Sequence, residues 1–183
     1  MLNESQRTSL TALAQCSIVH GIRYGCPIKV DTSQYDPILR AQGACFVTLH
    51  RHNQLRGCIG ALQAKHPLVE DVAINAYAAA FQDPRFPPMK KNEIDDLSIH
   101  ISVLSKPEPI DFSTEEELLK KMRPGVDGLI LVDRGHRGTF LPSVWDTLPE
   151  PKAFLQQLKL KAGLSEDYWS DSIQIERYTT ESW

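Results

Sequence analysis

A thiol placed two residues after a guanidinium is the feature of this sequence with the clearest chemical potential. Residues 55–60 read Leu-Arg-Gly-Cys-Ile-Gly, with Arg56 and Cys58 in positions that would share one face of a strand. A fixed positive charge beside a thiol favours the thiolate, the form that attacks electrophiles and binds metals. The segment therefore indicates Cys58 as a candidate nucleophile with Arg56 as its charged neighbour.

The two glycines beside Cys58 have two interpretations. Glycine weakens a strand interior, so Gly57 and Gly60 mark a place where another group comes close to the backbone. In the functional interpretation, that group is a ligand or substrate and the thiol is accessible. In the structural interpretation, Cys58 is one of the many free cysteines that pack as small apolar residues.

A thiol nucleophile normally needs a base within hydrogen-bond reach. Five histidines are available and the pattern selects none of them: His50, His52, His66, His100 and His136. Residues 97–103 alternate between apolar and polar side chains, which predicts a strand whose polar face carries His100.

The register of a predicted hairpin decides which side chains face the thiol. Residues 44–50 and 55–62 have strand composition and flank His52-Asn53. A loop of two residues would place Cys45 diagonally across from Cys58. A loop of three would place Thr48 and His50 on the face of Cys58, since a slip of one residue exchanges the faces.

A second candidate site lies at Asp83-Pro84-Arg85-Phe86. Proline fixes the backbone just after a predicted helix, so Asp83 and Arg85 can be held rigidly as binding residues. An arginine there could grip a carboxylate or phosphate with two hydrogen bonds. The structural alternative is a turn in which Arg85 pairs with Asp83 or with the carbonyls at the helix end.

The elements that would position these residues follow from periodicity, caps and breakers. We expect helices at 3–24, from 67 to about 82, at 113–122 with a Ser113/Glu116 capping box, and at 151–163. We expect further strands at 128–133 and 138–141, joined by residues 134–137, and at 172–178. Hairpins without regular strand–helix alternation predict an α+β fold with a mostly antiparallel sheet flanked by helices.

Four stretches together resemble the AMMECR-one domain family, known in prokaryotes as AmmeMemoRadiSam system protein A. They are residues 46–49, 55–60, 80–88 and 140–142, and the resemblance extends over residues 5–178. It implies a single domain over residues 1–183, with a smaller subdomain and a cleft between the two parts. It also implies a modification pathway shared with a Memo-like protein and a radical SAM enzyme. Where the family tends to have a carboxylate, this chain has His100.

Composition restricts the other classes of function. The formal net charge is −3 and the cations are dispersed, which argues against nucleic-acid binding. No apolar run approaches the roughly 20 residues that cross a bilayer, and the N-terminus lacks signal-peptide features, so we expect a cytoplasmic protein without membrane contact. The four cysteines lack the paired spacing of a metal site, and no motif identifies a cofactor.

Two functional hypotheses follow from the sequence. In the first, the protein is a catalytic or accessory component that uses Cys58 and Arg56 in covalent chemistry. In the second, it is a non-enzymatic module that binds a small ligand or a partner protein. There Gly57 and Gly60 permit close packing, Arg56 and Arg85 contact an anion, and Cys58 is only a wall residue.

Overall fold

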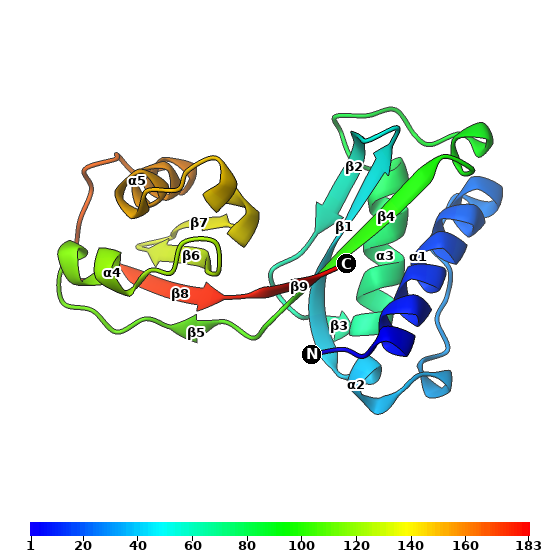
Figure 1. Cartoon of the computed structure of the whole chain (residues 1–183), viewed down its shortest axis with the longest axis horizontal. Helices are drawn as coiled ribbons and strands as arrows, with labels where there is room; N and C mark the ends of the chain where they lie inside the picture. Colours follow the sequence, from blue (N-terminus) through cyan, green and yellow to red (C-terminus); the bar gives the residue numbers. More distant parts are fainter. The chain divides into compact units, whose positions relative to one another are not determined.

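The computed structural model describes every residue from Met1 to Trp183 and divides into two compact units (Figure 1). Unit 1 comprises Met1–Leu104 and Glu181–Trp183, and unit 2 comprises Ser105–Thr180. Each unit packs helices on an antiparallel sheet, which confirms the predicted α+β class. None of the helices combines the length and the apolar character needed to cross a bilayer.

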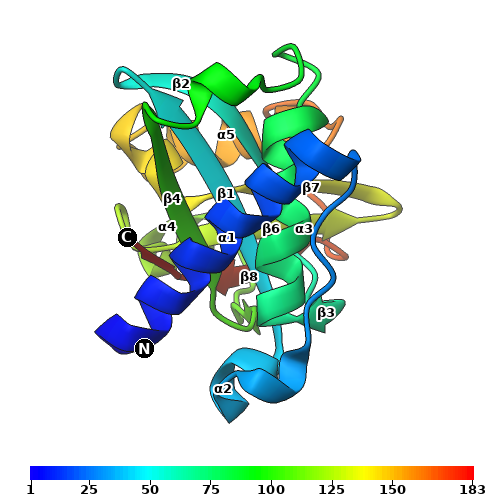
Figure 2. The same ribbon diagram turned by 90° about the vertical axis from the view of Figure 1, so that its right-hand side faces the viewer.

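Unit 1 is built on a five-stranded sheet with the order β2-β1-β4-β9, in which β3 pairs with the start of β1. Helices α1 and α3 lie on the same side of this sheet (Figure 2). The elements of unit 1 are α1 (Glu4–Tyr24), α2 (Pro37–Arg40), β1 (Gln42–Arg51), β2 (Gln54–Gly60), β3 (His66–Pro67), α3 (Leu68–Phe81), β4 (Leu97–Leu104) and β9 (Thr180–Ser182).

Helix α1 begins and ends at the residues that its sequence signals indicate. Asn3 is the N-cap and forms a reciprocal capping box with Gln6, in which each side chain accepts from the other residue's backbone N–H at 2.9 Å. Gly25 ends the helix with a φ of 69°, a left-handed conformation that glycine adopts without strain. The buried side of α1 then packs against α3, where Ser17 donates a hydrogen bond to the Ala73 carbonyl at 2.7 Å.

Helix α3 approaches strand β2 so closely that a side chain does not fit between them. A Cβ atom on Gly57 would lie 2.0 Å from the carbonyl oxygen of Ala79. A Cβ atom on Gly60 would lie 2.4 Å from the carbonyl oxygen of Cys45 on the neighbouring strand. The group that comes close to the backbone at each glycine is therefore another part of unit 1, and the run of alanines in α3 makes this contact possible.

A carboxylate in the first turn of α3 also fixes the helix to the sheet. Asp71 is buried and its Oδ2 accepts hydrogen bonds from the Cys45 backbone N–H and from Asn75 Nδ2, both at 2.9 Å. Burial raises the pKa of Asp71 above its ordinary value. The hydrogen bond from the Cys45 N–H joins the start of α3 to strand β1.

Unit 2 has a four-stranded antiparallel sheet with the order β5-β8-β6-β7 and a separate apolar core that includes Phe154 and Leu158 of its longest helix. Its elements are β5 (Glu108–Pro109), α4 (Glu115–Lys121), β6 (Gly128–Asp133), β7 (His136–Phe140), α5 (Pro151–Lys161) and β8 (Gln174–Tyr178).

Three predicted boundaries in unit 2 differ from the structure. The N-cap of α4 is Thr114, which accepts from the Glu117 N–H at 3.2 Å, so the Ser113/Glu116 capping box was wrong by one position. The β6–β7 loop is two residues rather than four, because Arg134 and Gly135 both adopt positive φ, as a tight hairpin turn requires. Strand β8 starts at Gln174 rather than at residue 172, since Ser172 donates to Asp133 at 2.6 Å.

Substituting Gly57 by alanine tests the close contact between β2 and α3. Because the new Cβ would lie 2.0 Å from a backbone oxygen, we expect Gly57→Ala to lower the free energy of unfolding by about 3 kcal/mol. Urea denaturation measures the change. The exposed Gln54→Ala change in the same strand is the control, with an expected effect within about 0.5 kcal/mol. Equal stabilities of the two variants would contradict the contact.

Candidate functional site

The β1–β2 hairpin combines features of both predicted registers. Its turn has two residues, His52 and Asn53, with φ values of 50° and 61°. The pairing then shifts between Leu49 and His50, which leaves Arg56 as an extra residue on β2. This β-bulge exchanges the faces of the strand beyond it. Cys58 consequently lies directly opposite Thr48, as the three-residue loop would have placed it.

The thiol faces away from α1 and α3, within a row of polar side chains that crosses three strands. Gly57 contacts α3, so the next side chain, Cys58, points to the other face of the sheet. Its Sγ atom lies 3.2 Å from Thr48 Oγ1. Thr48 in turn pairs with His100 on β4, and the His100 ring meets the His50 ring edge-on at 5.1 Å between centroids. The structure thus brings a thiol, a hydroxyl and two imidazoles to one face.

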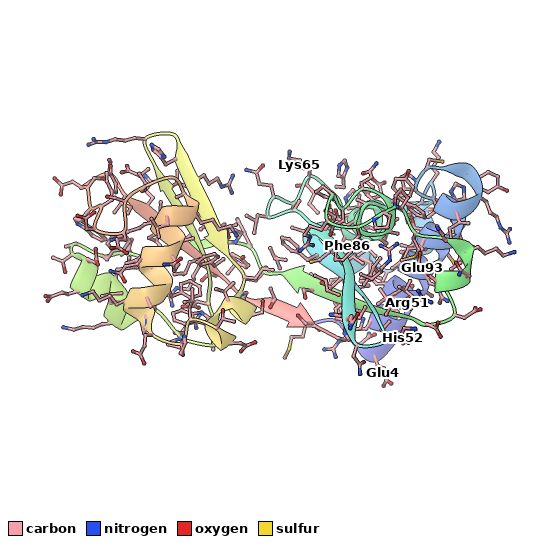
Figure 3. The ribbon with its side chains drawn as sticks, turned by 90° about the horizontal axis from the view of Figure 1, so that it is seen from above. Glu4, Arg51, His52, Lys65, Phe86 and Glu93 are labelled. Carbon is pink, nitrogen blue, oxygen red and sulfur yellow. The ribbon has the colours of Figure 1, made fainter.

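Arg56 does not share this face, contrary to the sequence-based prediction. Its Nε donates to Glu93 Oε1 at 2.8 Å and its Nη2 donates to the Pro87 carbonyl at 2.9 Å. Arg51 approaches the same Glu93 carboxylate at 3.8 Å (Figure 3). The bulge at Arg56 is the physical reason, because it breaks the alternation that would have aligned residues 56 and 58.

The backbone of Cys58 is held instead by the second candidate motif. Asp83 Oδ2 accepts from the Cys58 N–H at 2.9 Å, and Arg85 Nη2 donates to the Cys58 carbonyl at 3.3 Å. Strand β2 is an edge of the sheet, and edge strands present backbone groups that lack a neighbouring strand. Asp83 and Arg85 occupy both of these groups at Cys58.

Asp83 and Arg85 also bind each other. Together they form a clamp, a rigid pair of side chains that holds the N–H and C=O groups of Cys58. Arg85 donates to Asp83 through Nε at 2.9 Å, through Nη2 at 2.6 Å and through its backbone N–H at 3.1 Å. These hydrogen bonds hold the pKa of the buried Asp83 carboxyl well below its ordinary value, with the Arg85 side chain as the main cause. The pKa of Arg85 is raised, chiefly by Asp83 and to a smaller extent by Cys58.

The Phe86 ring lies beside both Arg56 and Arg85. The guanidinium carbon of Arg85 is 5.5 Å from the centroid of the Phe86 ring, and that of Arg56 is 5.9 Å from it. Cation–π contacts of this kind add to the anchoring of both side chains. The Arg85 side chain is nevertheless 53% exposed, whereas the Arg56 side chain is 11% exposed. Arg85 is therefore the arginine that can contact a ligand.

The other cysteines lie in different environments. Cys45 is fully buried on the helix side of β1, and burial raises the pKa of its thiol well above the ordinary value. Cys16 and Cys26 are exposed, and Cys58 is partly exposed. No group of three His, Cys, Asp or Glu side chains is arranged to hold a metal ion.

Sequence reasoning missed Glu93 entirely. It lies 37 positions after Arg56, and a short 3₁₀ helix, Lys91–Glu93, brings it to the edge of the sheet. Its pKa is lowered, first by the hydrogen bond from Arg56. Glu93 is the last residue of this helix, and two more acidic residues, Asp95 and Asp96, follow it closely in the sequence. No spacing rule distinguishes the one that meets Arg56.

Comparison with known proteins gives a consistent family match. The sequence profile of the family AMMECR1 matches residues 11–183 of this chain. A protein of Thermotoga maritima is 40% identical over 164 residues, which cover 87% of this chain and 88% of that protein. A protein of Saccharolobus solfataricus is 40% identical over 190 residues, covering 97% of this chain and 80% of that one.

A solved structure shares the whole fold. The crystal structure of an uncharacterised protein from Pyrococcus horikoshii superposes with a TM-score of 0.87 at 34% sequence identity. The match covers 99% of this chain and 92% of that one.

Removing the charge of Asp83 tests the clamp. We expect Asp83→Asn to lower the free energy of unfolding at neutral pH by about 3 kcal/mol, because it breaks a buried charge-assisted network. The folded-state pKa of Asp83 is depressed, so its contribution is complete above the unfolded-state pKa of about 3.9 and is lost as the pH falls below it. Urea denaturation between about pH 7 and pH 3 should show that the difference in free energy of unfolding between wild type and Asp83→Asn becomes smaller.

The exposed Asp95→Asn change is the matched control for that experiment, with an expected effect within about 0.5 kcal/mol at every pH. A gap between wild type and Asp83→Asn that stays constant down to about pH 3 would contradict the assigned role of the carboxylate.

Proposed function

Since the chain belongs to the AMMECR1 family, we propose that it is a catalytic or accessory component of a modification pathway and that the Cys58 thiol is its reactive group. The partners in this proposal are a Memo-like protein and a radical SAM enzyme, and they derive from the family resemblance alone. The proposal about Cys58 derives from its surroundings in unit 1.

The contact between Cys58 and Thr48 carries the proposal. The Thr48 hydroxyl lies 3.2 Å from Sγ, so it can accept a hydrogen bond from the thiol or donate one to the thiolate. Donation to an anionic sulfur stabilises the charged form that attacks an electrophile. The sulfur would supply the electron pair of a new bond to an electrophilic carbon. A π bond or a bond to a leaving group at that carbon would break and carry away its electron pair, and the thiol proton would pass to water.

The rigid backbone of Cys58 supports the same role. Asp83 and Arg85 hold its N–H and C=O groups, so the thiol is presented from a fixed peptide. A nucleophile gains from such preorganisation, because the geometry of attack is set before the substrate binds. In this proposal Asp83 and Arg85 are positioning residues, and the exposed side of Arg85 is also available to a negatively charged part of the substrate.

A binding module without catalysis is the second candidate, and a specific observation favours it. Gly57 and Gly60 are required by packing within unit 1, and Arg56 is engaged by Glu93. These three residues therefore have structural explanations that need no chemistry at the thiol. In this alternative, Arg85 binds an anionic group of a small ligand or partner protein and Cys58 forms part of the wall.

Alkylation of the folded protein distinguishes the two candidates. We expect iodoacetamide to modify Cys58 at least as fast as the more exposed Cys16 and Cys26, with Cys45 protected by burial. Mass spectrometry of the digested protein measures each rate, and Cys58→Ser identifies the Cys58 signal. If Cys58 reacts only after unfolding, its role as a nucleophile is contradicted and the binding module is favoured.

Replacing Thr48 tests the hydroxyl that carries the proposal. We expect Thr48→Val to slow alkylation of Cys58 about tenfold, the effect of losing one hydrogen bond of about 1.4 kcal/mol. Thr48→Ser keeps the hydroxyl and should stay within about threefold of the wild-type rate. Thermal unfolding of both variants serves as the control for folding. Equal rates in the valine and serine variants would exclude a role for the hydroxyl.

A further inference from the structure

The exposed side of helix α1 carries few charges for a surface helix. Residues 8–22 contain no Asp, Glu, Lys or Arg, although α1 buries only one side against the rest of unit 1. Exposed helix faces are normally rich in charged side chains. Depletion of charge is instead typical of the central part of a protein–protein interface.

Two adjoining hollows run along this side of α1. One, of about 620 Å³, is walled by Trp183, and the other, of about 400 Å³, is walled by Ile28. Both are lined by Ala12 and Gln15, so they meet near the middle of the helix. Helix α1 lies on the side of the sheet opposite Cys58, so these hollows are separate from the candidate site.

The residues along the hollows form a stripe whose spacing reads the same in both directions. Each of the following residues lines at least one of the two hollows: Glu4, Thr8, Ala12, Gln15, Val19 and Arg23. Successive members are separated by four, four, three, four and four positions, which keeps them on one face of a helix. A stripe with this symmetry can pair with itself in the antiparallel direction.

We propose that α1 pairs antiparallel with α1 of a second copy of this chain, about a two-fold axis that passes between Ala12 and Gln15. This axis places Glu4 opposite Arg23 of the second copy, and the symmetry repeats that pair at the other end. The acidic residue at one end of an otherwise uncharged stripe thus meets the basic residue at the other end. The small side chain of Ala12 lets the two helices approach closely at the axis.

The exposed ring of Tyr24 and the hollow walled by Trp183 form a second complementary pair between the two copies. Tyr24 is 67% exposed and its ring is supported by His20, with 4.6 Å between centroids. The same two-fold axis brings Tyr24 to the hollow walled by Trp183 in the second copy. Arg7, which also lines that hollow, is paired with Glu181 at 2.7 Å, and its guanidinium carbon lies 5.7 Å from the centroid of the Trp183 ring.

A second copy of the chain fits these features better than an unrelated partner does. Each chain supplies both the tyrosine and the hollow, and both charges of the terminal pair. That is the property of an isologous interface, which closes at the dimer. The anchors are of the kind that dominate interface energies, a tyrosine in a hollow lined by tryptophan.

Charge exchange tests the antiparallel register. Sedimentation equilibrium of the wild-type chain over a range of concentrations should show association to twice the mass of one chain. We expect Glu4→Arg alone and Arg23→Glu alone to weaken dimerisation about tenfold each, because each replaces two attractive pairs by two repulsive ones. The double variant should recover the wild-type constant to within about threefold.

Removing the tyrosine provides an independent test. Tyr24→Ala should weaken dimerisation at least about tenfold, whereas Ile38→Ala, which removes an exposed apolar side chain outside the hollows, should leave it unchanged. Thermal unfolding confirms that each variant is folded. A wild-type chain that stays monomeric at all concentrations overturns the proposal. A dimer that responds to neither the charge changes nor Tyr24→Ala also overturns it, because the interface then lies elsewhere.

Discussion

The approach of α3 to β2, where the Ala79 carbonyl meets Gly57, is the constraint on which unit 1 depends. It sets the distance between helix and sheet and turns the side chain of Cys58 to the other face. It also brings the residues after α3 beside the edge of the sheet, where Asp83 reaches the Cys58 N–H. At the opposite end of the helix, Asp71 binds the Cys45 N–H. The helix is therefore fastened to the sheet at both ends by carboxylates.

The bulge at Arg56 places the side chains of Arg56 and Cys58 in different surroundings. Arg56 belongs with Glu93 and the Pro87 carbonyl, and Cys58 belongs with Thr48. The positive charge nearest to the Cys58 backbone is that of Arg85. A thiol, a hydroxyl and a clamped peptide are then the groups from which any chemistry at this face must be built.

Much of unit 1 follows from local signals in the sequence. The capping box at Asn3 and the turn at His52-Asn53 are both present, because each depends on residues that are neighbours in the chain. The partners of Arg56 and of the Cys58 backbone could not be predicted in the same way. Glu93 and Asp83 lie 37 and 25 positions from their partners on β2, so these contacts depend on the tertiary fold. A one-residue bulge also leaves no periodic trace in the sequence. The α+β class was predictable because a one-residue shift changes neither the apolar–polar alternation of the strands nor the glycines and prolines that end the elements.

The clamp on Cys58 determines the direction from which another molecule can arrive. A strand approaching along the edge of β2 would need the outward N–H and C=O of Cys58 for its own ladder, and Asp83 and Arg85 already hold both. Docking by strand addition is thereby blocked at this position. A molecule that reaches the thiol therefore approaches the face of the sheet that carries Cys58 and Thr48. The exposed guanidinium of Arg85 lies beside this face, at the edge formed by β2.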